Sequence, residues 1–434
     1  MVVPANIYKT AKGARVNRIL SRIKYVASHP LARGSAIVFI GTMAANVGAY
    51  LYHLVVGRIL GPVQYGELAA LLSLSYILNV FSVMLQTVVT RFVAHHAAKG
   101  EYGDIRTLVL HLGAFLLGAG AIVIFSLLIA APMIASFLHV RDTIVVYFIF
   151  IGVIVSMLSI VLSSVLQGLQ RFTAGMVIAN INSVLRLVSG VLAAGFGVTA
   201  TIGAGLGTGI IAFILTLLPL RTILLTKQKS SSFSLQSLFS TSTATFLTIL
   251  GISVMNSQDV VMVKHFLPEL ASGWYGALST MGKIIFFASS SIMYVLLPVV
   301  TERSATGKHT QSLVYGSVGI VAALSLTITA GFFLLPVFSL QLLYGSAFVA
   351  ASPYLGIFGI FSSFYTIAYT IVMALMGLGK TAVWMILIGA AILQDVLLSM
   401  FHQSIAMVIW TNIAIAAVLV LSLLVYYRHA LQKH

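Results

Sequence analysis

The chain has 434 residues, of which 60% are hydrophobic and only 7% are charged. Soluble domains carry about 25% charged residues, so this composition excludes a soluble protein and predicts one that is surrounded by lipid. The charges are unbalanced, with 24 Lys and Arg against 8 Asp and Glu, and the absence of cysteine excludes disulfides and thiolate metal sites.

The first segment, residues 1–34, is predicted to form a basic amphipathic helix on the cytoplasmic face of a membrane. Val16, Ile19, Leu20 and Ile23 share one helical face, and basic residues surround them. Such helices bind anionic leaflets, although a role in fixing topology alone is the simpler interpretation. A signal peptide is not predicted, because the next apolar run has full spanning length and lacks a small-residue cleavage site.

Twelve apolar runs follow, each about as long as the roughly 20 residues that cross a hydrocarbon core. They predict an all-α polytopic membrane protein with a six-helix N-terminal lobe, a cytoplasmic linker, a six-helix C-terminal lobe and a cytoplasmic tail. These parts comprise residues 35–220, 221–238, 239–426 and 427–434. The runs lie at about 35–56, 68–90, 107–132, 143–165, 173–196, 198–220, 239–262, 275–300, 312–336, 352–375, 382–402 and 404–426.

The basic residues orient these spans. With the N-terminus inside, 19 of the 24 Lys and Arg lie in cytoplasmic segments, and only Arg58, Arg141 and Lys264 lie in outer loops. Cytoplasmic enrichment of Lys and Arg is the general rule, so the protein is predicted to be a multi-pass membrane protein with both termini inside. The net charge of +16 therefore reflects topology and gives no indication of nucleic-acid binding.

The chain repeats itself with a shift of about 210 residues. The turn after the first span, which contains Arg58, Gly61, Pro62, Tyr65 and Gly66, matches residues 267–276 after the seventh span. Residues 166–171 match residues 375–380 in the same way. A shift of six spans preserves orientation, so the two lobes are predicted to be related by a pseudo-two-fold axis along the membrane normal.

Polar side chains form stripes on the first, second, seventh and eighth spans, at spacings that place them on one helical face. These stripes predict a hydrated cavity between the lobes, although interhelical hydrogen bonds worth about 0.6 kcal/mol each explain any single stripe. The predicted cavity residues are Thr42, Asn46, Tyr50, Asn79, Ser82, Gln86, Asn256, Ser279, Ser290 and Tyr294, and His53 shares the face of the first three.

Four charged residues lie inside predicted spans, where charge is costly and usually functional. Asp259 and Lys283 are close enough to the outer surface to pair there, either as a structural ion pair or as part of a site. Arg186 and Asp395 follow Arg171 and Lys380 by 15 residues each, and therefore occupy equivalent depths in the two lobes. They are predicted either to pair across the interface in one state or to be satisfied by Asn182 and Gln394 within their own lobes.

The remaining patterns do not indicate catalysis. Gly203, Gly205, Gly207 and Gly209 predict close helix packing, and the adjacent His95 and His96 are interpreted as part of a solvated inner loop. Paired carboxylates, a nucleophile elbow and a metal cluster are not found in the sequence. We therefore expect a protein that is not an enzyme and that uses neither a metal nor a cofactor.

The residues at 58–66, the segment Leu166–Phe172 and the run from Asp259 to Gly276 resemble the oligosaccharide flippases of bacterial polysaccharide biosynthesis (the Wzx-like branch). These belong to the multidrug/oligosaccharidyl-lipid/polysaccharide (MOP) exporter superfamily. The resemblance covers about residues 35–426 and implies a two-lobed, twelve-helix transporter similar to MATE proteins, whose cavity is built from the first, second, seventh and eighth spans.

The resemblance also implies a substrate. An undecaprenyl-diphosphate-linked sugar repeat unit would be turned from the inner to the outer leaflet of the bacterial cytoplasmic (inner) membrane by alternating access. For such a substrate, we expect a cationic group such as Lys283 or Arg186 to hold the diphosphate. The expected partners are this lipid-linked oligosaccharide, membrane lipids and other polysaccharide-assembly proteins. The alternatives are a multidrug or organic-cation antiporter that couples through Asp259 or Asp395, a lipid II flippase, and a non-transporting scaffold.

Overall fold

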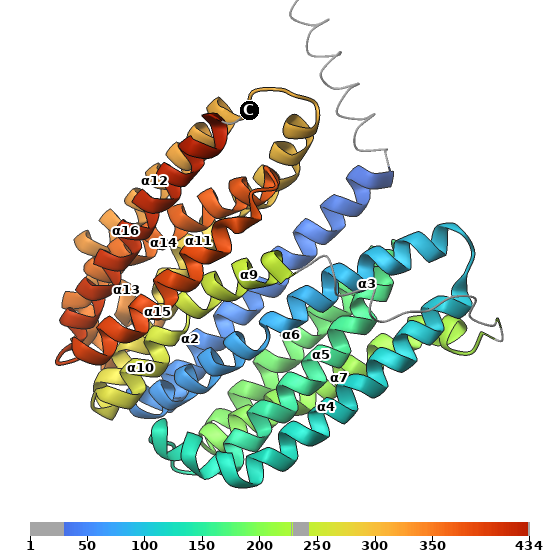
Figure 1. The fold of residues 1–434 in the computed structure, drawn as a ribbon. Helices are drawn as coiled ribbons and strands as arrows, with labels where there is room; N and C mark the ends of the chain where they lie inside the picture. The colour runs from blue at the N-terminus through green and yellow to red at the C-terminus, as the bar shows by residue number, and fades with distance from the viewer. Residues whose placement is uncertain (1–29, 227, 229–242, 433–434) are drawn as a thin grey trace, which may run out of the picture.

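The computed structural model describes residues 30–226, 228 and 243–432 (Figure 1), and these residues contain helices and no strands. The predicted amphipathic segment 1–34 and the linker 221–238 lie largely outside the described residues. The N-terminal lobe comprises α2 (Pro30–Leu78), α3 (Val80–Ala98), α4 (Tyr102–Phe137), α5 (Ile144–Gly168), α6 (Phe172–Ala194) and α7 (Val198–Leu224). The C-terminal lobe comprises α9 (Thr243–Met255), α10 (Gln258–Phe266), α11 (Glu269–Ala305), α12 (Gln311–Leu334), α13 (Pro336–Leu343), η1 (Ser346–Ala351), α14 (Ser352–Gly377), η2 (Thr381–Val383), α15 (Trp384–Met400) and α16 (Ile405–Gln432).

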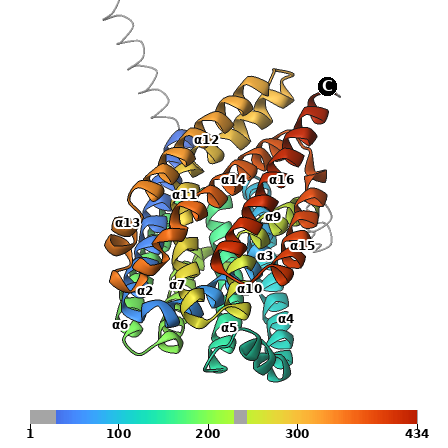
Figure 2. The ribbon, with the colours of Figure 1, turned by 90° about the vertical axis from the view of Figure 1, so that its left-hand side faces the viewer.

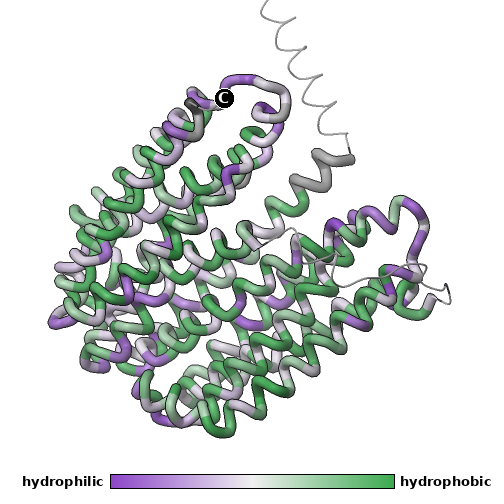
Figure 3. The backbone as a smooth tube through the Cα atoms, in the orientation of Figure 1, coloured by the Kyte–Doolittle hydropathy of each residue, from purple (hydrophilic) through white to green (hydrophobic). Residues whose placement is uncertain are grey.

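The prediction of about twelve spans in two lobes is confirmed. Eleven helical stretches among the described residues are long and apolar enough to cross a membrane. The first of them, Ile37–Ala98, is 62 residues long and turns back at Gly61, so it provides two crossings. Large apolar side chains such as Phe125 and Ile129 point outward and are 74% and 79% exposed, as expected for a lipid-facing surface. Figure 3 shows that hydrophilic residues gather mainly at the connections between helices.

The turn at Gly61 explains how two spans join without a loop. Gly61 has φ of +70°, a conformation that glycine adopts without steric cost. Pro62 follows it in the first turn of the next helical segment, where its missing N–H is no loss. The chain therefore reverses within two residues, and the side chains on both sides of the turn keep fixed positions.

Two helices are interrupted part-way across the membrane. The second crossing breaks at Asn79, whose Nδ2 donates to the Ser75 carbonyl over 2.9 Å. The predicted seventh span breaks at residues 256–257 into α9 and α10. Interrupted helices are tolerated at membrane depth only where protein or water satisfies the freed backbone groups, so these breaks indicate regions that do not face lipid.

The two lobes contact each other mainly at one end, seen at the lower left of Figure 1. We call this the closed end; it contains residues 58–66, 267–276 and 335–346. The lobes diverge toward the opposite, open end, which contains the α3–α4 and α11–α12 connections, and Figure 2 shows the arrangement from the side. At the closed end Tyr65, Tyr344 and Phe348 form one buried core across both lobes, each at most 1% exposed.

Candidate functional site

The two copies of the repeated turn meet at the closed end. A Cβ atom added to Gly273 would overlap the carbonyl of Pro62, and one added to Gly66 would lie 2.7 Å from the Gly273 nitrogen. Arg58 Nη2 donates to the carbonyls of Gln341 and Leu342 in the last turn of α13, each over 2.9 Å, and so links the first turn to the other lobe. The predicted motif turn is therefore part of the contact that closes this end.

Tyr65 carries a hydrogen-bond network from one lobe to the other. Its hydroxyl lies 2.9 Å from Thr280 Oγ1 and 3.0 Å from the Tyr344 hydroxyl, both in the C-terminal lobe. On its own side, the same hydroxyl lies 3.2 Å from His53 Nδ1. Because Tyr65 is fully buried, separation of the lobes would have to break its bonds to Thr280 and Tyr344.

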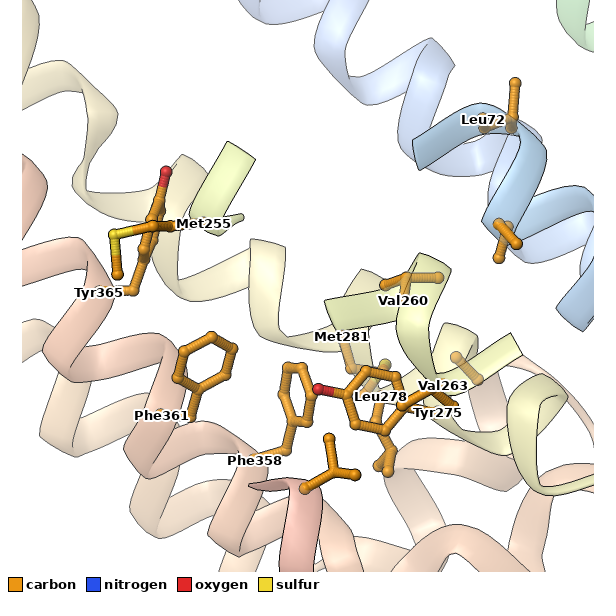
Figure 4. Packing of buried hydrophobic residues seen from close by; sticks show 14 of the residues in the cluster. Leu72, Met255, Val260, Val263, Tyr275, Leu278, Met281, Phe358, Phe361 and Tyr365 are labelled. Atoms are coloured by element: carbon orange, nitrogen blue, oxygen red, sulfur yellow. The ribbon is translucent and has the colours of Figure 1, made fainter. Parts of the chain in front are cut away.

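Tyr275 is the repeat-related counterpart of Tyr65, but its bonds stay inside the C-terminal lobe. Its hydroxyl donates to Asp259 Oδ2 over 2.7 Å and accepts from Asn412 Nδ2 over 3.0 Å. Gln394 Nε2 donates to Asn412 Oδ1 over 2.8 Å and extends the network. Figure 4 shows Tyr275 packed beside Phe358 within this lobe. The two equivalent tyrosines therefore serve different purposes, one between the lobes and one within a lobe.

This difference predicts opposite outcomes for two matched substitutions. Tyr65→Phe removes a hydroxyl that bridges the lobes, and buried partners left unsatisfied cost about 1–3 kcal/mol, so the closed end should open more often. Tyr275→Phe should lower the melting temperature without changing the distance between lobes. Because the chain has no cysteine, spin labels on introduced cysteines at Phe196 and Val337 report that distance directly. An unchanged distance distribution in Tyr65→Phe would contradict the assigned role.

Two cations lie in the membrane interior beside the Tyr65 network, each over an aromatic ring. Lys283 Nζ of α11 lies 5.1 Å from the ring centre of Tyr76 on α2. The Arg186 guanidinium lies 4.9 Å from the ring centre of Tyr52. His53 connects the two tyrosines, with its ring 5.6 Å from that of Tyr52 and its Nε2 3.5 Å from the Tyr76 hydroxyl. Neither cation belongs to an ion pair within the part of the chain that the structure describes.

The two acidic residues predicted as their partners lie elsewhere or are already engaged. Asp259 is 1% exposed and hydrogen-bonded, and it shares with Lys283 a small cavity of about 20 Å³, enough for about one water molecule. Asp395 is exposed on α15, between the exposed Ile392 and Val396. Arg186 and Asp395 are thus not paired in this conformation, and Gln394 is bonded to Gln258 and Asn412 instead.

The structure does not bring the other predicted cavity residues together in one site. Tyr50 faces the opposite lobe, where its hydroxyl lies 3.7 Å from Met281 Sδ. Asn79 and Ser82 line a cavity inside the N-terminal lobe, and Asn256 and Ser279 line the small cavity beside Lys283. Thr42 contacts Met176, and Gln86 contacts Gln167, both within the N-terminal lobe. Ser290 donates to the carbonyl of Phe287 in its own helix, and Asn46 is half-buried on α2. The side chain of Tyr294 lies outside the described residues.

The cavity inside the N-terminal lobe has a volume of about 450 Å³ and lies between α2, α3, α5, α6 and α7. Tyr52, Asn79, Asn182 and Arg186 contribute to its walls. The sequence stripes indicated only the α2 and α3 walls. The walls from α5 and α7 carry serines, threonines and glycines, which give too weak a signal in sequence to be distinguished from ordinary helix packing.

A further group, at the open end, was not expected from the sequence. His96, Glu101 and Asp104 place ligand atoms within 4.8 Å of one another, with His96 Nε2 3.8 Å from Glu101 Oε2. The grouping arises because α3 ends and α4 begins within four residues. Acidic groups at a helix N-terminus and a histidine in a last turn complement the helix dipoles, which accounts for the cluster without a ligand.

Comparison with known proteins places this geometry in a context. A family model described as "Polysaccharide biosynthesis protein" matches residues 31–304. No match was found among curated proteins by sequence.

Solved structures of MOP superfamily transporters share the fold. A multidrug-resistance MATE transporter in its inward-facing conformation aligns with a TM-score of 0.73 at 13% identity, covering 88% of this chain and 95% of that one. The lipid II flippase MurJ in an inward closed conformation aligns with a TM-score of 0.72 at 12% identity, covering 91% and 87%. A MATE transporter in its outward-facing conformation aligns less well, with a TM-score of 0.54 at 15% identity, covering 94% and 98%.

Proposed function

Because the chain belongs to the polysaccharide biosynthesis protein family, we propose that it flips undecaprenyl-diphosphate-linked oligosaccharide repeat units from the inner to the outer leaflet of the bacterial cytoplasmic membrane. Movement of the two lobes would provide alternating access. The observation that carries the proposal is the pair of cations, Lys283 and Arg186, that lie over aromatic rings in the membrane interior and form no ion pair among the described residues.

The electrostatics favour an anionic substrate. Unpaired charge inside a membrane is costly, and cation–π contacts worth about 0.5–2 kcal/mol offset only part of that cost. A diphosphate supplies the missing negative charge and accepts charge-assisted hydrogen bonds, while the polyprenyl chain remains in lipid. Lys283 lies on the C-terminal lobe next to the lobe contact and is therefore in a position to bind the diphosphate as the lobes move.

The closed end supports an inward-facing state. With both termini in the cytoplasm, as the distribution of Lys and Arg predicts, the closed end is the outer one and the open end receives substrate from the inner leaflet. The better alignment with an inward-facing MATE transporter than with an outward-facing one, 0.73 against 0.54, supports the same assignment. Partnership with other polysaccharide-assembly proteins is part of this proposal.

The antiporter alternative requires a carboxylate that faces the substrate path. Asp395 is on an exposed face of α15, and Asp259 is buried and bonded to Tyr275. The groups that remain beside the lobe contact are cationic, and these would repel an organic cation. A scaffold without transport has no use for unpaired cations in the membrane. We therefore favour the flippase, and with it a protein that is not an enzyme.

A leaflet-accessibility assay tests the proposal. A fluorescent polyprenyl-diphosphate oligosaccharide is incorporated into proteoliposomes, and an impermeant quencher is added outside. Quenching should occur in two phases, and the rate of the slow phase should be at least tenfold higher with the protein than in empty liposomes. Equal rates in both preparations, together with transport of a fluorescent organic cation by the same vesicles, would favour the antiporter instead.

A further inference from the structure

The cavity inside the N-terminal lobe has the composition of a carbohydrate subsite. Its walls combine amides and hydroxyls, from Asn79, Ser82, Ser156 and Thr208, with the aromatic rings of Tyr52, Tyr76 and Phe148. Its volume of about 450 Å³ falls within the range of about 300–1,000 Å³ typical of small-ligand sites. Lys283 is absent from its walls, so it is distinct from the small cavity in the C-terminal lobe.

Glycines create this space. Cβ atoms added to Gly152 and Gly205 would meet no atom within 4 Å, and both residues line the cavity. The glycines of α7 were expected from the sequence to allow close helix packing. Gly203 does so, since a Cβ there would lie 3.3 Å from the Phe148 ring of α5, whereas Gly205 and Gly209 line the cavity between α5 and α7.

Two buried polar atoms in the cavity walls have no partner. They are Asn182 Oδ1 and Arg186 Nε, both on α6 and one turn apart. Arg186 is held in place by Tyr52, which itself packs where Gly190 leaves room, since a Cβ at Gly190 would overlap the Tyr52 ring. Arg186 is half-buried and its guanidinium lies over the Tyr52 ring, but among the described residues it forms no ion pair and its Nε has no hydrogen-bond partner, so an anionic ligand would complete both its charge and its hydrogen bonds.

The two atoms require different chemistry from one ligand. Arg186 offers a guanidinium, which binds a carboxylate through a planar fork. Asn182 Oδ1 is an acceptor and needs a hydroxyl or amide N–H, which an ionised diphosphate does not have. In the substrate the diphosphate is attached to the lipid and the sugars lie beyond it, so a site for a sugar is separate from the site for the diphosphate.

We propose that the N-terminal cavity is a subsite for an acidic sugar of the transported repeat unit, in which Arg186 binds the carboxylate and Asn182 accepts a hydrogen bond from a hydroxyl or acetamido group. This inference rests on the proposed flippase function and narrows its substrate to anionic oligosaccharides. Lys283 is left to bind the diphosphate.

Two lipid-diphosphate disaccharides that differ only in their terminal sugar, glucuronate or glucose, test the inference in proteoliposomes. The natural protein should flip the glucuronate lipid at least tenfold faster than the glucose lipid. In Arg186→Gln this ratio should fall to about one, whereas Arg171→Gln, on the exposed α5–α6 connection, should keep it. Arg186→Lys should restore part of the ratio, which a purely structural role for Arg186 would not produce.

A second measurement separates the subsite from the flippase function. Saturation-transfer NMR detects binding of the free glucuronate-terminated disaccharide to the full chain in nanodiscs, and Gly205→Leu, which fills the cavity, should abolish it. Equal flipping of both lipids, or a parallel loss of both in Arg186→Gln with the ratio kept, would overturn the subsite and leave the flippase standing. Arg186-dependent binding without any flipping would retain the subsite and overturn the flippase.

Discussion

Replacing Gly273 by alanine should shift the protein away from the closed-end conformation and lower the flipping rate at least fivefold. The added methyl group would overlap the carbonyl of Pro62 across the lobe contact. Overpacking of this kind costs about 1–3 kcal/mol, which corresponds to a change of about 5–150-fold in a conformational equilibrium. Gly273 lies within helix α11, where alanine is favoured over glycine, so the penalty arises only while the two turns are in contact.

Distances between spin labels measure the predicted shift. Cysteines at Phe196 and Val337 span the closed end, and cysteines at Lys99 and Thr306 span the open end. In Gly273→Ala the first distance should lengthen and the second should shorten. Gly319→Ala is the matched control, because a Cβ at Gly319 meets nothing within 4 Å. If Gly273→Ala had the distances of the natural protein, the contact of Pro62 with Gly273 would not hold the closed end shut.

The architecture was predictable because it depends on long, redundant signals. Each span consists of about 20 apolar residues, and the repeat at 58–66 and 267–276 relates one half of the chain to the other. What the sequence could not reveal is that these two matching turns contact each other, because similarity between two segments does not imply proximity. The role of Arg58 depended on that contact, since its bonds reach Gln341 and Leu342 of the other lobe.

The site was predictable only in part, because helical periodicity fixes a face but not what the face meets. Thr42 and Tyr50 lie on one stripe, yet Thr42 contacts Met176 in its own lobe and Tyr50 contacts Met281 in the other lobe. The equal depth of Arg186 and Asp395 likewise left two predictions open, pairing across the interface or bonding within each lobe, because depth leaves the rotation of each helix undetermined. In the structure, Asp395 lies on an exposed face of α15 and the Arg186 guanidinium lies over the Tyr52 ring.

The two repeat-related tyrosines show how two lobes of similar sequence can have different roles. Tyr65 is bonded to His53, 12 residues before it, and Tyr275 to Asp259, 16 residues before it. The acid keeps Tyr275 bonded within its lobe, while the hydroxyl of Tyr65 is shared with Thr280 and Tyr344 of the other lobe. Movement of the lobes then breaks one network and leaves the other intact, so the C-terminal lobe can move as a rigid unit that carries Lys283.

Lys283→Gln should reduce flipping of every lipid-diphosphate substrate at least about 100-fold, whatever the sugar. Removing one partner of a buried charge pair costs about 3–5 kcal/mol, and each 1.36 kcal/mol changes a rate tenfold. Glutamine keeps most of the length of the side chain and removes only the charge. Lys308→Gln, on an exposed connection, is the control and should flip normally, and Lys283→Arg should retain a measurable rate.

Comparing the two substrates in Lys283→Gln distinguishes binding of the diphosphate from recognition of the sugar. If Lys283 binds the diphosphate, its loss should lower the rates for glucuronate and glucose lipids by the same factor, whereas loss of Arg186 should change their ratio. The position of Lys283 on α11, over Tyr76 of the opposite lobe, means that movement of the lobes changes what faces its ammonium group. A flipping rate in Lys283→Gln within threefold of the natural protein would remove Lys283 from the substrate path and leave its contact with Tyr76 as a structural link between the lobes.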